Sequence, residues 1–159
     1  MRDVFRILEQ DARTPPEKIA TMTGLPEDEV RRIIADAQRD RTILKYRTIV
    51  NWEKLGEPEV WALIQVKVIP QRDVGFDAIA ERIYRFPETN SVWLVSGEYD
   101  LAITVTATDI YEISRFVSEK LSTIEGVQAT VTNFLLKRYK QDSEILVEKE
   151  ESRRQPLSP

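Results

Sequence analysis

The chain has 159 residues, with 23 Lys and Arg against 27 Asp and Glu, and it contains neither Cys nor His. This length suits one ordinary domain or two small ones. The absence of Cys excludes disulfides, thiolate nucleophiles and zinc–thiolate sites, and the absence of His removes the residue most used for acid–base catalysis and metal ligation. We therefore expect a binding protein rather than an enzyme, with no metal and no cofactor.

The expected location and the net charge further restrict the possible classes of protein. No apolar run approaches the roughly 20 residues that cross a bilayer, and the N-terminal stretch has no signal-peptide pattern, so a cytoplasmic location is expected. A net charge of -4 disfavours a nucleic-acid partner. However, residues 1–50 carry ten basic against nine acidic residues, so the acidic surplus lies in the rest of the chain.

Residues 1–50 predict three short helices. The third, from Pro26 to about Asp40, repeats apolar residues at helical spacing. Ala20, four residues before Gly24, allows the close helix crossing of a helix-turn-helix, although a plain helical hairpin shares this spacing. Beyond the third helix, the β-branched and aromatic residues of "TILKYRTIVNW" predict a small strand pair, or wing, followed by a connector.

From residue 60 the order is strand, helix, strand, strand, helix, strand. This order predicts an α+β, ferredoxin-like βαββαβ domain with both helices on one face of an antiparallel sheet. "DIYEISRFVSEKL" begins with Asp109 and Glu112 in the spacing of a capping box. The expected organisation is a winged helix-turn-helix over 1–50, a connector or hinge over 51–59, the βαββαβ domain over 60–140 and a partly disordered tail over 141–159.

The sheet is expected to have one uncovered face. Ile64, Val66 and Val68 alternate toward the helices, which leaves Trp61 and Leu63 on the other side. The last strand is expected to alternate Val127, Ala129 and Val131 against Gln128, Thr130 and Thr132. An uncovered apolar face indicates a partner subunit, unless the connector folds across it.

"VSGEYD", residues 95–100, separates the second and third strands of the predicted domain. Gly97 supplies the positive φ of a tight turn and Asp100 caps such a turn through its backbone. The same two residues suit a zwitterion, because Gly97 lets backbone N–H groups approach a carboxylate while Asp100 accepts from an ammonium group.

As a whole, residues 4 to about 140 resemble the Lrp/AsnC (leucine-responsive, or feast/famine) transcriptional regulators. The most specific matches are "LEQDAR", "ILKY", "VNWEKLG", "VSGEYDLAI" and "EKLSTIEGVQATVTNFLLKRY", in this order along both domains. The resemblance implies a regulator that binds double-stranded DNA. It also implies a ligand domain that forms homodimers through its sheet and assembles further, often to octamers, with an amino acid held between dimers.

Carried onto this sequence, the resemblance implies an effector site at Gly97 and Asp100, with Glu98 and Tyr99 between them, and at Thr132 and Asn133 of the last strand. It places the dimer interface on the sheet face that carries Trp61 and Leu63.

On the DNA side, Arg31, Arg32 and Arg39 lie away from the apolar stripe of the third helix. Arg31 and Arg32 are candidates for phosphate or base-edge contacts, with Lys45 and Arg47 on the wing for backbone contacts. Each is equally compatible with an ordinary solvated cation. The family commonly has a Ser cap followed by uncharged residues, whereas this helix starts with three carboxylates that would face phosphates.

We consider three candidate functions for this protein. The first is a DNA-binding regulator that senses an amino acid or similar metabolite. The second is a metabolite-binding or assembly protein with a degenerate helix-turn-helix that does not read DNA. The third is an enzyme on the same scaffold, as in the siroheme decarboxylases, which resemble this family in fold but depend on histidine.

Overall fold

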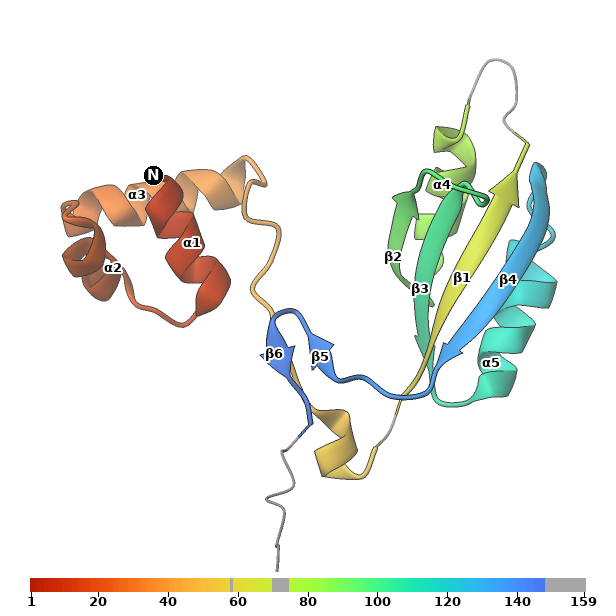
Figure 1. The fold of residues 1–159 in the computed structure, drawn as a ribbon. Coiled ribbons are helices and arrows are strands. Elements are labelled where there is room, and N and C mark those ends of the chain that lie inside the picture. The colour runs from red at the N-terminus through yellow and green to blue at the C-terminus, as the bar shows by residue number, and fades with distance from the viewer. Residues whose placement is uncertain (58, 70–74, 148–159) are drawn as a thin grey trace, which may run out of the picture. The chain divides into compact units, whose positions relative to one another are not determined.

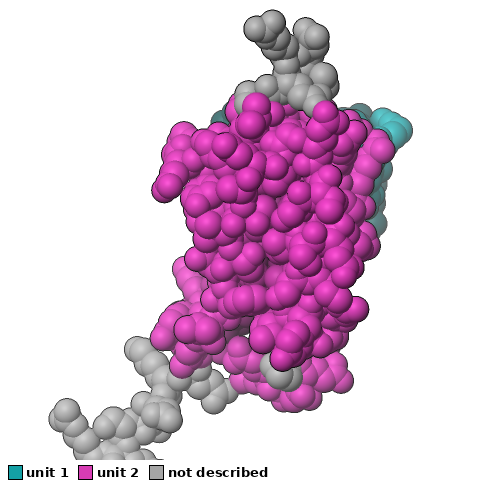
Figure 2. Space-filling view, turned by 90° about the vertical axis from the view of Figure 1, so that its right-hand side faces the viewer, with its two compact units in different colours: residues 1–50 teal, residues 51–159 magenta. Residues whose placement is uncertain are grey.

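The structure is a computed structural model that describes residues 1–57, 59–69 and 75–147. Two compact units divide the chain, Met1–Val50 and Asn51–Pro159 (Figure 2). Within the described ranges, no helix is long and apolar enough to cross a membrane.

The first unit consists of the three predicted helices, α1 (Arg2–Gln10), α2 (Pro16–Thr23) and α3 (Glu27–Arg39) (Figure 1). They enclose a small core that contains Val4, Leu8, Ile19 and Val30. Pro16 starts α2 because its missing N–H has no helical partner in the first turn. Gly24 ends α2 with a φ of 72°, a left-handed conformation that favours glycine. The following turn leads directly into α3.

The strand pair expected over residues 42–52 is not formed, since residues 41–51 contain no strand. Ile43 instead donates its N–H to Ala37 O over 2.8 Å and packs against the helical core. The β-branched residues of this segment favour extended backbone, but strand formation also needs a paired neighbour. The described part of the first unit offers no second strand for this pairing.

The second unit has the expected βαββαβ order (Figure 1). Its main elements are β1 (Val60–Val68), α4 (Asp77–Tyr84), β2 (Thr89–Leu94), β3 (Leu101–Ala107), α5 (Ile110–Arg115) and β4 (Val127–Leu135). A 3-10 helix, η1 (Trp52–Leu55), precedes β1, and a π-helical segment, η2 (Phe116–Leu121), extends α5. The strand order is β2-β3-β1-β4 with antiparallel neighbours, which confirms the ferredoxin-like domain.

The core lies between one face of the sheet and the helices α4 and α5. Strand β1 buries Ala62, Ile64, Val66 and Val68 there, and the helices contribute Ile79, Ile83 and Ile113. Trp61 and Leu63 alternate onto the opposite face, as predicted. We call this second side the helix-free face.

Strand β4 departs from the expected alternation. Val127 packs against the core, whereas Ala129 and Val131 pair with Lys67 and Gln65 on the helix-free face. The cause is a shift of register between Lys67 and Val68, which moves the following residues of β4 to the other side of the sheet. Periodicity within β4 alone does not reveal this shift, because the shift depends on the pairing with β1.

The start of α5 confirms the predicted capping interaction. Asp109 Oδ1 accepts a hydrogen bond from Glu112 N over 2.9 Å. The Glu112 carboxylate accepts from the N–H of Thr108 over 3.0 Å, one residue earlier than the usual reciprocal partner. The helix thereby begins at a fixed residue beside the end of β3.

A small hairpin follows the sheet, formed by β5 (Lys140–Gln141) and β6 (Glu144–Ile145). Asp142 and Ser143 take positive φ values of 47° and 73°, which is the requirement of a tight type I′ turn. Asn51 Nδ2 donates to Leu146 O over 3.2 Å, so the hairpin is tied to the first residue of the second unit. The disorder expected beyond residue 150 and the predicted hinge residue Pro58 lie outside the described residues.

Candidate functional site

The turn between β2 and β3 is closed by backbone hydrogen bonds at its base. Val95 N donates to Asp100 O over 2.9 Å, and Asp100 N donates to Val66 O over 3.0 Å. Gly97 has a φ of 149°, a value that L residues rarely adopt, although a Cβ there would meet no atom within 4 Å. Backbone conformation, not crowding, therefore accounts for glycine at this position.

Asp100 is the best-anchored polar side chain of the turn. Its Oδ2 accepts from Val68 N over 2.8 Å, and Lys67 Nζ lies 3.3 Å from Oδ2 and 3.4 Å from Oδ1. Lys67 Nζ also donates to Glu98 O over 2.8 Å. The Asp100–Lys67 pair thus clamps the turn onto the end of β1, at the register shift.

The environment of Asp100 favours its charged form. The Val68 N–H lowers the pKa of the Asp100 carboxyl; burial acts in the opposite direction, and the hydrogen bond and charge of Lys67 lower the pKa again. The net pKa lies below the ordinary value. Asp100 is therefore an ionised group already in use as a turn cap.

The accessible cation of this turn is Lys67, whose side chain is 39% exposed. Lys67 is not among the site residues predicted from the sequence. Lys67 lies more than 30 residues from the turn along the chain, and the one available indication was its polar place in the alternation of β1. With Lys67 present, the turn offers an ammonium group and a glycine backbone, which suits the carboxylate end of a small ligand.

Thr132 and Asn133 do not join the turn within one chain. Thr132 pairs with Ile64 and faces the helices, whereas Asn133 pairs with Leu63 on the helix-free face. The level of Leu63 is four residues along β1 from Lys67, which corresponds to roughly 13 Å. The predicted effector residues thus form two separate groups in the single chain, one at the turn and one on β4.

Two of the candidate DNA-binding arginines are paired on their own helix. Arg31 Nε and Nη2 donate to Glu27 Oε1 over 2.8 and 2.5 Å, and Arg39 Nη2 donates to Asp36 Oδ1 over 2.6 Å. The hydrogen bond from Arg31 to Glu27, together with their opposite charges, raises the pKa of Arg31 above its ordinary value. Arg31 is therefore cationic at any working pH, but it is shared with a carboxylate.

Arg32 and Lys45 are exposed and form no ion pair with the described part of the chain. Arg47 is also exposed. Over its length, α3 carries Arg31, Arg32 and Arg39 against four carboxylates. Because exposed ion pairs of this kind contribute little stability, their arginines exchange partners at small cost when phosphates approach.

Comparisons with known proteins agree with the geometry of both units. Residues 61–145 match a family described as the Lrp/AsnC ligand binding domain. Over 158 residues the chain is 42% identical to "Uncharacterized HTH-type transcriptional regulator YugG" of Bacillus subtilis, covering 99% of this chain and 95% of the relative. This match spans the helical unit as well as the sheet domain.

Two solved structures share the fold. The structure of E. coli AsnC aligns with a TM-score of 0.68 and 20% identity, covering 88% of this chain and 92% of that one. The complex of NMB0573 from Neisseria meningitidis with L-Met aligns with a TM-score of 0.69 and 22% identity, covering 87% and 89%. The curated relatives are transcriptional regulators rather than enzymes, which confirms the expected absence of catalysis.

The Asp100 clamp makes a prediction about stability. Asp100→Asn should lower the free energy of unfolding at pH 7, because the ion pair with Lys67 is lost. A carboxyl with a lowered folded-state pKa contributes stability that is present above its unfolded pKa of roughly 3.9 and is lost as the pH falls through the folded pKa. The difference between variant and parent should therefore shrink between neutral pH and about pH 3, as measured by urea unfolding.

The exposed carboxylate of Glu125 provides the control. Glu125→Gln should match the parent at both pH values. A deficit of Asp100→Asn that is the same at both pH values would contradict the role of the charge.

Proposed function

Since the chain belongs to the Lrp/AsnC family of transcriptional regulators, we propose that it binds specific DNA sequences through its first unit and a small effector through its second. The observation that carries this proposal is the 42% identity to an HTH-type regulator over both units. An amino acid is the proposed class of effector, and a homodimer that assembles further, for example to an octamer, is the proposed form. A DNA-bound regulator works where the DNA is, so a cytoplasmic location belongs to the same proposal.

For the DNA side, we propose α3 as the recognition helix. Its core-facing residues Val30 and Ala37 are buried, and Arg32 lies exposed on the outer side. Arg32 and Lys45 are the readiest phosphate contacts because no carboxylate of the described chain is paired with them. Arg31 and Arg39 join only when they leave Glu27 and Asp36. DNA binding through this surface should be weak in the absence of the right sequence and strongly dependent on salt.

The DNA proposal predicts opposite effects of two substitutions. Arg32→Ala should weaken binding and reduce the slope of log affinity against log salt by about 1, as expected for one lost phosphate contact. Glu27→Gln should strengthen binding, because it removes a negative charge from the helix tip and leaves Arg31 with only the longer ion pair to Glu17, at 3.9 Å. Fluorescence anisotropy with a fragment from upstream of the protein's own gene, at several salt concentrations from about 50 mM upward, measures both effects.

A matched control exists in the second unit, where Arg85 pairs with Glu81 four residues earlier, as Arg31 does with Glu27. Arg85→Ala should leave DNA binding unchanged. If the parent protein binds no fragment at the lowest salt concentration, the second function, an assembly or metabolite-binding protein with a degenerate helix-turn-helix, replaces the regulator. The four carboxylates of α3 support this alternative, because they would face the DNA phosphates.

For the effector side, we propose a site assembled from two protomers. The turn with Gly97, Glu98, Tyr99 and Asp100 supplies one half, and Asn133 on the helix-free face of another protomer supplies the other; Thr132 faces the helices and is not part of this proposal. The separation of the two groups within one chain supports this arrangement. That the structural relative NMB0573 forms a complex with L-Met makes an amino acid a reasonable first candidate.

The effector proposal assigns the ligand carboxylate to Lys67. A thermal-shift screen of the common amino acids should identify one that raises the melting temperature of the parent, because a ligand stabilises the folded state that binds it. The shift should be smaller in Lys67→Met than in Lys137→Met, a control lysine whose ammonium lies 5.2 Å from the Tyr139 ring centroid. Equal shifts in both variants would remove Lys67 from the site.

For the assembly, we propose the helix-free face as the dimer interface. Trp61 and Leu63 lie on its inner strand β1, and Trp93 of β2 and Val131 and Leu135 of β4 are 37–49% exposed. Arg138 stacks over the Trp61 ring at 4.8 Å, which covers only part of this surface. Residues Trp52 and Glu57 of the connector line a hollow at the end of β3, together with Thr106 and Thr108. These described connector residues therefore lie at the end of the sheet where β3 finishes.

A charge at the centre of this face should separate the protomers. Leu63→Glu is expected to convert the dimer into a monomer, because a carboxylate desolvated in the interface lacks a partner. Tyr111→Glu, at an exposed aromatic residue of α5, should leave the mass unchanged. Light scattering at several protein concentrations measures both, and a monomeric parent protein would contradict the proposal.

A further inference from the structure

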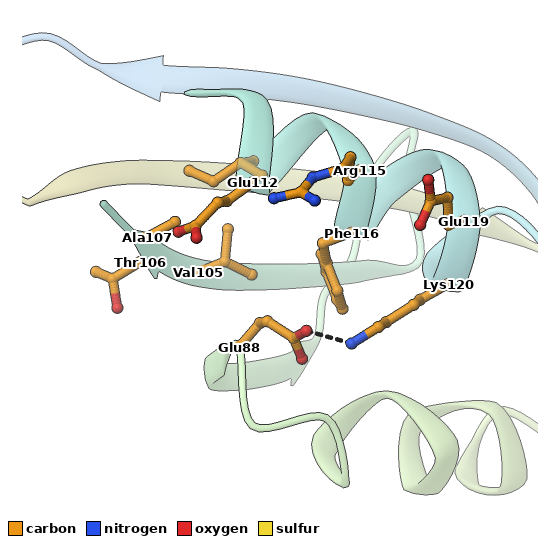
Figure 3. A pocket seen from close by; sticks show the side chains of 10 residues that line it. Glu88, Val105, Thr106, Ala107, Glu112, Arg115, Phe116, Glu119 and Lys120 are labelled. Atoms are coloured by element: carbon orange, nitrogen blue, oxygen red, sulfur yellow. Dashed lines mark hydrogen bonds and ion pairs between the residues drawn. The ribbon is translucent and has the colours of Figure 1, made fainter. Parts of the chain in front are cut away.

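A hollow of about 330 Å³ lies on the helix side of the sheet, away from the turn and from the helix-free face. Strand β3 contributes its last residues, Val105 to Ala107, and the helical segment α5–η2 forms the opposite side (Figure 3). Glu88, in the segment before β2, closes one end together with Lys120 of η2. The volume lies within the range of small-molecule sites, roughly 300–1,000 Å³.

Glu88 is only partly satisfied in this hollow. Its Oε1 pairs with Lys120 Nζ, and Figure 3 shows the two side chains turned toward each other. Its Oε2 atom is buried and has no hydrogen-bond partner among the described residues, whereas the Glu88 side chain as a whole is 30% exposed. A buried carboxylate oxygen without a donor is costly, so this position favours a ligand that brings an N–H group.

Burial and the ion pair with Lys120 shift the pKa of the Glu88 carboxyl in opposite directions. Burial raises the pKa of the Glu88 carboxyl, but the hydrogen bond from Lys120, the backbone N–H of Glu88 itself and the charge of Lys120 outweigh it and leave the pKa below its ordinary value. Glu88 is thus an anion at neutral pH, held at the end of a hollow.

The helical side of the hollow is locally unusual. Phe116–Leu121 is π-helical, and Ser122 N donates to Val117 O over 2.8 Å, a spacing of five residues. Such π-helical turns occur frequently at functional sites, because the extra residue redirects the side chains that follow. Here the segment carries Lys120, whose ammonium lies 5.7 Å from the centroid of the Phe86 ring. The Lys120 ammonium is therefore held by both the Glu88 carboxylate and the Phe86 ring.

The remaining lining groups complete a bipolar surface. Arg115 reaches the hollow from α5 and forms no ion pair with the described residues, whereas Glu112 is occupied by Thr108. Val105 and Phe116 provide apolar contact. Glu88, Glu112 and Glu119 line the hollow together with Arg115 and Lys120, so it presents both signs of charge and suits a small molecule that carries both an ammonium and an acidic group.

We propose that this hollow is a second small-molecule site, in which the ammonium group of an amino acid donates to Glu88 Oε2 and its carboxylate lies against Arg115. All its described residues come from one chain, in contrast to the effector site proposed at the turn. The site does not depend on DNA binding or on assembly.

Isothermal titration of the full-length protein with each common amino acid, and with putrescine and cadaverine as amines without a carboxylate, tests the site. At least one amino acid should bind, and Glu88→Gln should weaken that binding roughly tenfold or more, since a charge-assisted hydrogen bond is lost. Lys67→Met, which alters the turn, should leave this binding unchanged. Tighter binding of the diamines than of any amino acid would overturn the role of Arg115 and with it the proposed ligand.

Ala107→Leu provides a second variant that leaves the Glu88–Lys120 pair intact. It narrows the hollow at the end of β3 and should weaken the same binding. Two outcomes would overturn the proposal: no amino acid binds the parent protein, or binding is lost in Lys67→Met and kept in both Glu88→Gln and Ala107→Leu. The second outcome would assign all binding to the turn and would leave the effector proposal standing.

Discussion

One-sided burial of the sheet is the constraint on which the second unit depends. Alternate residues of β1 reach a core closed by α4 and α5, and their exposed fractions are 4% or less. The same alternation necessarily sends Trp61 and Leu63 to the other side. An antiparallel sheet tolerates one solvated face, but two large apolar side chains at its centre make that face an interface candidate. Core formation and assembly are thus two results of a single strand pattern.

Much of this fold was predictable because its determinants are local in sequence. Helical spacing identifies α3, and the cap of α5 follows from Asp109 and Glu112. The ion pair between Glu27 and Arg31 was also within reach, since residues four apart on a helix are neighbours. The order of strands and helices restricted the sheet to very few topologies.

The features that escaped prediction depend on contacts between distant segments. The clamp from Lys67 to the turn joins residues over 30 positions apart, and the altered alternation of β4 arises from its pairing with β1. The strand pair predicted after α3 is missing for the same reason. The β propensity of a segment favours extended backbone, but a strand also needs a second strand to pair with. The π-helical segment that carries Lys120 has no recognisable pattern in the residues themselves. Candidate sites that depend on such contacts can be identified only from the three-dimensional structure.

The hydrogen bond from Asn51 to Leu146 also has a mechanical consequence. It anchors the first residue of the second unit to the C-terminal hairpin, while Ile43 is held at the end of α3. Seven residues separate Ile43 from Asn51, and within them Tyr46 OH accepts a hydrogen bond from Gln38 Nε2 of α3 over 3.4 Å. The beginning of the second unit is therefore fixed by residues almost 100 positions later in the chain, and loss of the Asn51 side chain would release the C-terminal hairpin from it.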